Sequence, residues 1–214
     1  MRSSIYGKNV DDNSERFLQF VKGGCKDSKI NLVLSPERQV ETEGIKCNGY
    51  FDHTDKILTV ATGQSFDAWF KILVHEFSHM RQWIEQCKAW TESEKDGDAN
   101  DTMDKWLNST VNLSKKNKNK FVNRARDLEL DCDKRALNWI RAFKLPINER
   151  DYIKRANAYI YFYTYIKETR KWYTIGKEPF NNWLLVLAMP THFDNDYDNP
   201  PEVIKRLYRG CIGE

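Results

Sequence analysis

No long hydrophobic run occurs in this sequence of 214 residues. Its longest strongly apolar stretch, Trp183–Met189, is far shorter than the ~20 residues that a membrane-spanning helix needs. The N-terminal residues also lack the apolar stretch of about 7–15 residues that follows the charges of a secretory signal. We therefore expect a soluble, cytoplasmic protein that has no signal peptide and no membrane partner.

Cysteine is scarce and shows no pairing pattern. The chain has five cysteines, an odd number, and no two of them form a C-x-x-C pair. This argues against a disulfide framework and against a zinc ribbon. We expect reduced thiols in an intracellular compartment.

A strong excess of one charge is also missing. The formal net charge is +3, from 34 Lys and Arg against 31 Asp and Glu, whereas a dedicated nucleic-acid-binding domain is usually much more basic. Hydrophobic residues make up 40% of the chain, which is enough to build a packed core. We expect one folded domain over residues 1–214, without a nucleic-acid partner.

Local patterns divide the chain into a small β-region followed by helices. Apolar runs bounded by turn residues predict strands over 30–34, 44–51 and 57–61. Helical spacing and capping residues predict helices over 12–21, 65–90, 121–143, 151–173, 180–189 and 202–208. The polar segment at about 91–120 is expected to be an insertion outside the core. The order indicates an α+β fold with a small N-terminal sheet and a mainly helical body.

One short motif points to metal chemistry. The sequence HEFSH occupies residues 75–79, inside a predicted helix, and residues four apart on a helix share one face. His75 and His79 can therefore bind one zinc ion. Glu76 projects beside that ion, where it can take a proton from a metal-bound water and pass it to a leaving amine. This is the physical basis of the H-E-x-x-H pattern.

A catalytic zinc site needs a third protein ligand. Glu129 lies in a stripe of small and apolar residues on the helix predicted over 121–143, where a carboxylate is costly unless it is paired or binds a metal. Asp133, four residues later, is placed to accept the free N–H of a ligating histidine. The other candidate ligands are Asp127, Asp131 and His192. Ion pairs with Arg126 or Arg135 would be the purely structural explanation of Glu129 and Asp133.

The motif at 75–79, followed by Glu129-x-x-x-Asp133 on another helix, resembles the gluzincin group of zinc metallopeptidases. The size and layout resemble small single-domain zincins of phages and bacteria. The resemblance implies His75, His79 and Glu129 as zinc ligands, Glu76 as general base and Asp133 as the residue that orients a ligand. It also implies a zincin-like fold, in which an edge strand of a small sheet binds extended substrate, and residues 57–61 stand at the expected place.

Three residues are candidates for stabilising the oxyanion of a tetrahedral intermediate. Tyr161 and Tyr165 share a face of the helix predicted over 151–173, although tyrosines at such positions more often serve packing. His192 follows a proline in an irregular tail that can reach a cleft.

These features together predict a zinc metallopeptidase that hydrolyses peptide bonds through a zinc-bound water activated by Glu76. Its partner would be a peptide or protein substrate, and its cofactor Zn²⁺. Two alternatives stay open, because a fold alone does not establish a function. One is a zincin-fold binding or regulatory protein without activity, and the other is a helical interaction protein in which the motif arose by chance.

Overall fold

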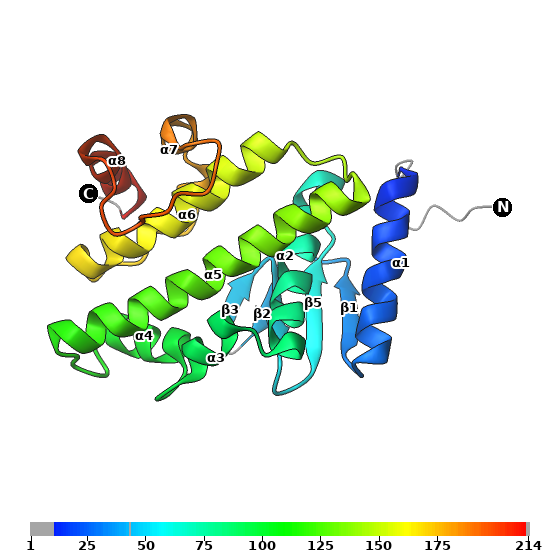
Figure 1. Cartoon of the computed structure of the whole chain (residues 1–214), viewed down its shortest axis with the longest axis horizontal. Coiled ribbons are helices and arrows are strands. Elements are labelled where there is room, and N and C mark those ends of the chain that lie inside the picture. Colours follow the sequence, from blue (N-terminus) through cyan, green and yellow to red (C-terminus); the bar gives the residue numbers. More distant parts are fainter. Residues whose placement is uncertain (1–10, 43, 213–214) are drawn as a thin grey trace. The chain divides into compact units, whose positions relative to one another are not determined.

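The computed structural model of this chain describes residues 11–42 and 44–212 (Figure 1). Helices account for most of these residues, and the strands form one three-stranded and one two-stranded sheet, so the α+β class predicted from the sequence is confirmed. Among the described residues, none of the helices combines the length and the apolar character that crossing a membrane requires. Residues 1–10, to which the expectation of no signal peptide refers, lie outside the described part.

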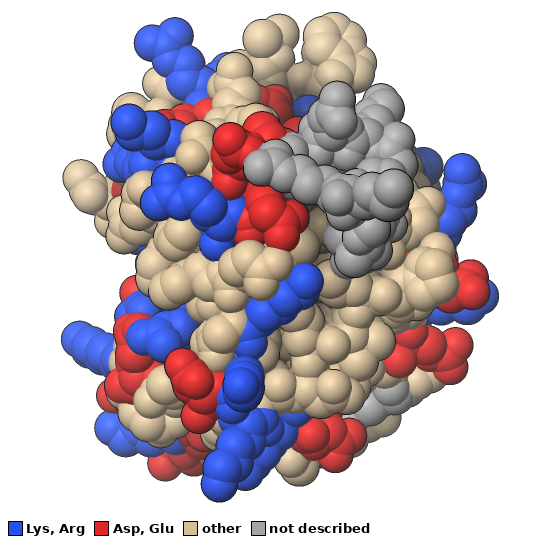
Figure 2. Space-filling view, turned by 90° about the vertical axis from the view of Figure 1, so that its right-hand side faces the viewer, with Lys and Arg blue, Asp and Glu red and all other residues tan. Residues whose placement is uncertain are grey.

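The chain folds as two compact units, and each is assembled from two segments. The first unit contains Met1–Gln86 and Arg135–Ile147, and the second contains Cys87–Lys134 and Asn148–Glu214. The expectation of one zincin-like domain stays a prediction, because this division does not show whether the units fold separately. Basic and acidic side chains are interspersed on the face viewed in Figure 2, as the nearly balanced composition leads one to expect.

The strands belong to the first unit. In the three-stranded sheet, β5 (Ile57–Ala61) is central, with β1 (Asn31–Ser35) parallel to it on one side and β4 (Gly49–Asp52) antiparallel on the other. The two-stranded antiparallel sheet consists of β2 (Val40–Thr42) and β3 (Ile45–Cys47).

Two strand predictions are corrected by this arrangement. Residues 57–61 do not form an edge strand, because the strand is paired on both sides and its apolar side chains are mostly buried. The edge strands of this sheet are β1 and β4. The single strand predicted over 44–51 is two strands separated at Asn48, of which the first pairs with the short, unpredicted strand β2.

Helix α1 (Asp12–Asp27) begins at the N-cap Asp11, whose carboxylate accepts hydrogen bonds from two backbone N–H groups. The sequence predicts its end at Gly23-Gly24, but the helix continues to Asp27. The reason is packing, since a Cβ atom at Gly24 would lie 3.3 Å from the ring of Phe77. Gly24 therefore permits a close helix contact rather than ending the helix.

Helix α2 (Phe66–Glu85) carries the HEFSH sequence. Its N-cap is Ser65, whose hydroxyl accepts from the backbone N–H of Ala68, as the sequence predicts. The helix ends earlier than predicted, because Gln86 adopts a left-handed conformation with φ of 45°. A separate helix, α3 (Lys88–Glu94), follows it.

Aromatic rings hold α2 in the first unit. The ring centroid of Phe77 lies 5.9 Å from that of Phe17 on α1 and 5.8 Å from that of Trp139 on α5 (Lys115–Phe143). Phe143, at the end of α5, packs on Phe17 with the centroids 5.2 Å apart. These ring contacts, two of them edge-to-face, fix the rotation of α2 about its own axis, and with it the direction of the opposite, less buried face.

The second unit is a helical body around its own hydrophobic core. Its elements include α4 (Ala99–Leu107), most of α5, α6 (Glu149–Thr169), α7 (Trp183–Ala188) and α8 (Glu202–Tyr208). The segment expected outside the core contributes to it, because three apolar residues share one face of α4 and are at least 95% buried. They are Ala99, Met103 and Trp106.

Candidate metal centre

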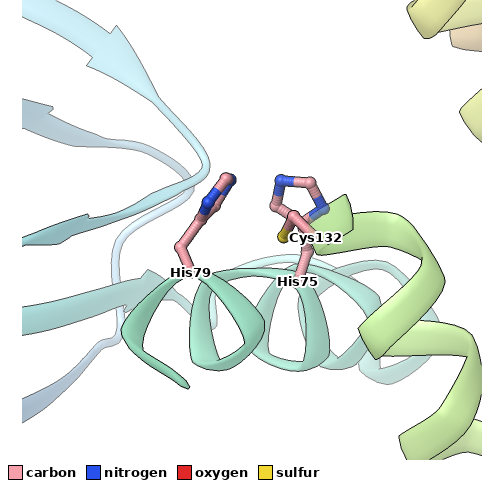
Figure 3. A group of neighbouring side chains, drawn as sticks. All are labelled: His75, His79 and Cys132. Atoms are coloured by element: carbon pink, nitrogen blue, oxygen red, sulfur yellow. The ribbon is translucent and has the colours of Figure 1, made fainter. Parts of the chain in front are cut away.

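The two motif histidines lie one turn apart on the same side of α2 (Figure 3). Their ring centroids are 4.8 Å apart and the ring planes are nearly perpendicular, at 83°. Both side chains are half-buried, while Phe77 and Ser78 between them are buried. The helix therefore presents two imidazoles together at the border of the core, as the spacing in the sequence predicts.

One ring nitrogen of His79 already has a partner within the helix. Nδ1 of His79 lies 2.8 Å from the amide oxygen Oε1 of Gln82, three residues later. Gln82 is completely buried. Because an amide oxygen only accepts hydrogen bonds, the proton of the neutral ring is on Nδ1, and Nε2 carries the lone pair.

Glu76 lies on the side of α2 that packs against the strands. A Cβ atom at Gly49, the first residue of β4, would be only 3.4 Å from Cγ of Glu76 and 2.6 Å from Cγ2 of Ile72. Burial raises the pKa of the Cys47 thiol at the end of β3; a backbone hydrogen bond with Gly49 opposes this rise, and the negative charge of Glu76 adds to it. The carboxylate of Glu76 thus lies near the start of the edge strand β4.

A third candidate ligand comes from α5. Cys132, His75 and His79 each offer one ligand atom, and these three atoms lie within 4.8 Å of one another (Figure 3). Cys132 is buried and lies less than one turn before Arg135, where α5 enters the first unit. Two imidazole nitrogens and one thiol are a donor set that suits zinc.

Glu129 and Asp133, the carboxylates singled out in the sequence, flank Cys132 on α5. Glu129 is half-buried. Burial raises the pKa of Tyr159, and the nearby Tyr163 and the charge of Glu129 add smaller contributions in the same direction. Asp133 is 95% buried and accepts a hydrogen bond of 2.7 Å from the hydroxyl of Tyr152. The group of close ligand atoms contains Cys132 and not Glu129, and the roles assigned to both carboxylates stay predictions.

The other ligand candidates have different surroundings. Asp127 is exposed and forms an ion pair with Arg126. Asp131 accepts from the thiol of Cys87 at 3.7 Å. His192 is exposed, and its backbone carbonyl accepts a hydrogen bond from Asn157.

Both candidate tyrosines are buried in the second unit. The hydroxyl of Tyr161 donates to the carboxylate of Asp194, and burial together with this bond raises the pKa of Tyr161. Tyr165 packs on the rings of Phe162 and Tyr208, with centroids 6.0 and 5.6 Å away. These contacts describe packing, and the role of Tyr161, Tyr165 or His192 toward an oxyanion stays a prediction.

Two residues of the centre were not predicted as functional. The sequence could have indicated Gln82, because residues three apart on a helix are neighbours, and Gln82 stands three residues after His79. Cys132 stands in the same apolar stripe as Glu129, three residues later, but a lone cysteine in such a stripe usually serves only as a small hydrophobic residue.

Comparison of the chain with protein-family models, curated proteins and solved structures found no match. The interpretation of the centre therefore depends on the residues and contacts of this chain alone.

Proposed function

We propose that this protein is a zinc-dependent metallopeptidase of the gluzincin type, with His75 and His79 as metal ligands. The observation that carries the proposal is the pair of imidazoles on one face of α2, with ring centroids 4.8 Å apart and Glu76 between them in sequence. The hydrogen bond between Nδ1 of His79 and Gln82, which puts the lone pair of the neutral ring on Nε2, also supports it. Two histidines that occur on a helix by chance would not require adjacent rings or a buried hydrogen-bond partner.

Each residue of the motif has a distinct task in this proposal. A bound zinc ion would act as a Lewis acid and lower the pKa of water at the site. The carboxylate of Glu76 would accept a proton from that water and return it to the leaving amine. General acid–base catalysis of this kind contributes about 10²–10⁴-fold to a rate.

Two residues of α5 compete for the place of third ligand. The close group of ligand atoms favours Cys132, whereas the gluzincin resemblance favours Glu129, one turn earlier on the same helix. A cysteine with two histidines occurs among catalytic zinc sites, as does a glutamate with two histidines. The proposal of a metallopeptidase is compatible with either residue.

The position of the edge strand supports a peptide or protein as substrate. In zincins an edge strand pairs with extended substrate, and here β4 is an edge strand that begins next to Glu76, at Gly49. An extended backbone is a natural ligand of a strand edge, because main-chain hydrogen bonds provide affinity without requiring a particular side chain. We extend the proposal to a zincin-like fold on the same grounds.

Metal analysis and one substitution test this function. The full chain, purified without chelators, should contain about one equivalent of zinc, and His75→Ala should lose it. Glu76→Gln should keep the zinc and lose about 10²–10⁴-fold of its peptide hydrolysis, measured on a mixture of unstructured peptides by mass spectrometry. Less than about half an equivalent of metal in the wild-type chain, or full activity in Glu76→Gln, would overturn the proposal.

A further inference from the structure

Gln82 is a polar side chain in an unusual position. It belongs to the last turn of α2, and its side chain has no exposed surface. Burying an amide costs free energy unless the amide is hydrogen-bonded. Its oxygen Oε1 lies 2.8 Å from Nδ1 of His79, so at least part of this cost is offset by a bond to a motif residue.

The orientation of this amide selects which nitrogen of the neutral His79 ring carries the proton and which carries the lone pair. With Oε1 facing the ring, Nδ1 carries the proton and Nε2 has the lone pair. With the amide NH₂ of Gln82 facing the ring, the proton would be on Nε2, and that nitrogen could not bind a metal. A hydrogen bond from one ring nitrogen is the usual device that fixes the tautomer and the ring direction of a ligating histidine.

We propose that Gln82 is the positioning residue of the metal centre, which fixes His79 in its Nδ1–H form and presents Nε2 to the metal. This rests on the proposed metal site. An amide suits the position because a carboxylate would carry a charge into fully buried surroundings, at a much larger desolvation cost. The Gln82 side chain is therefore uncharged, as a fully buried position favours, and still offers the acceptor that orients His79.

The tautomer can be observed without metal and without activity. The chain has only four histidines, so the ring nitrogens of His79 in the ¹⁵N-labelled, metal-free full chain can be assigned by comparison with a His79→Ala variant. At a pH where the rings are neutral, we expect the nitrogen shifts of the Nδ1–H form for His79. If the wild-type ring is predominantly in the Nε2–H form, the proposal is wrong, whatever the variants do.

Substitution then separates positioning from packing. Gln82→Met keeps the length of the side chain and removes the acceptor, so the fraction of Nδ1–H in His79 should fall and zinc affinity should drop about 10–100-fold. Gln82→Glu restores an acceptor and should restore the Nδ1–H form. Gln64→Met is the matched control, because Gln64 is another hydrogen-bonded glutamine of the first unit, which bonds Asn48 and the carbonyl of Arg38.

A purely structural role for Gln82 makes a different set of predictions. A structural role allows Gln82→Met to change the melting temperature. It requires the fraction of the Nδ1–H form of His79 to stay as in the wild type, and the zinc affinity, measured by competition with a chromophoric chelator, to stay within twofold of wild type. That result would overturn the positioning role. If the wild-type chain does not hydrolyse peptides, only the proposed activity is refuted, because the His79 tautomer and the zinc affinity are both measured without it.

Discussion

Arg135 on α5 contacts Glu85 near the end of α2, with Nη1 of the arginine 2.5 Å from Oε2 of the carboxylate. Arg81, one turn earlier on α2, binds the other carboxylate oxygen of Glu85 at 2.7 Å. Glu85 thereby joins the motif helix to the section of α5 that belongs to the first unit.

We predict a pH-dependent contribution of Glu85 to stability. Burial raises the pKa of Glu85, but the hydrogen bonds and charges of Arg135 and Arg81 outweigh it and bring the pKa below its ordinary value. A lowered pKa stabilises the fold above the unfolded-state pKa, and this stabilisation is lost as the pH falls through the folded-state pKa. Glu85→Gln should therefore lower the melting temperature at pH 7, and the difference from wild type should shrink as the pH falls through the folded-state pKa of Glu85. Because the carboxylate is partly exposed, the loss should be about 1 kcal/mol or less.

The third ligand can be identified with cobalt as a spectroscopic substitute for zinc. If Cys132 binds the metal, the Co²⁺ form should show a sulfur-to-cobalt charge-transfer band in the near ultraviolet. Cys132→Ser should abolish that band and lower metal affinity by at least about 100-fold. Removing a residue that only contacts a ligand, and not the metal, typically lowers affinity by about 10–100-fold. Glu129→Gln should leave the band unchanged. A wild-type spectrum without the band, together with a metal-deficient Glu129→Gln, would assign the position to Glu129.

Gly49 should not tolerate a side chain. A Cβ atom there would lie 2.6 Å from Ile72 on α2 and 2.9 Å from the carbonyl oxygen of Thr59 on β5. Gly49→Ala should therefore destabilise the fold by about 1–3 kcal/mol, measured by urea unfolding. Gly23→Ala is the matched control, since nothing lies within 4 Å of a Cβ at Gly23, and alanine in a helix should stabilise by up to about 1 kcal/mol. Equal effects of the two substitutions would contradict the close packing of β4 on α2.

Tyr161 should act through its bond to Asp194. This hydrogen bond is the main cause that lowers the pKa of Asp194. Tyr161→Phe should raise the pKa of Asp194 and destabilise the protein by about 1–3 kcal/mol. The difference from wild type should shrink as the pH falls through the folded-state pKa of Asp194, because the protonated carboxyl no longer needs the donor. A loss of about 10²–10³-fold in peptide hydrolysis with unchanged stability would instead identify Tyr161 as an oxyanion donor.

Several elements were predictable because one local rule decides each of them. Ser65 caps α2 as its hydroxyl suggests, and residues 57–61 and 202–208 form the strand and the helix that their patterns predict. The end of α2 was not predictable, because Gln86 takes a left-handed conformation that short-range signals assign to glycine or asparagine.

Within the site, the sequence placed the two imidazoles and Glu76 correctly on α2, because helical periodicity alone determines which residues share a face. It could not place α5, since the contacts of Arg135 and Trp139 with α2 join residues about 50–60 positions apart. The group of ligand atoms that includes Cys132 joins residues 53 or more positions apart in the sequence, which local patterns do not relate. Local rules describe one helix at a time, whereas the candidate ligand atoms come from two helices.

The interleaved order of the two units has a consequence for how the chain is made. Residues 1–86 reach the end of the motif helix, yet Trp139 and Phe143, which pack on Phe77 and Phe17, are synthesised only after the segment Cys87–Lys134 of the other unit. During translation the apolar face of α2 therefore stays without these aromatic contacts until more than 50 further residues have been synthesised. A fragment that ends at residue 86 would contain the whole HEFSH motif but would leave Phe77 without its neighbour Trp139 and Phe17 without Phe143. Helix α2 therefore cannot be isolated as a minimal peptide with its native packing.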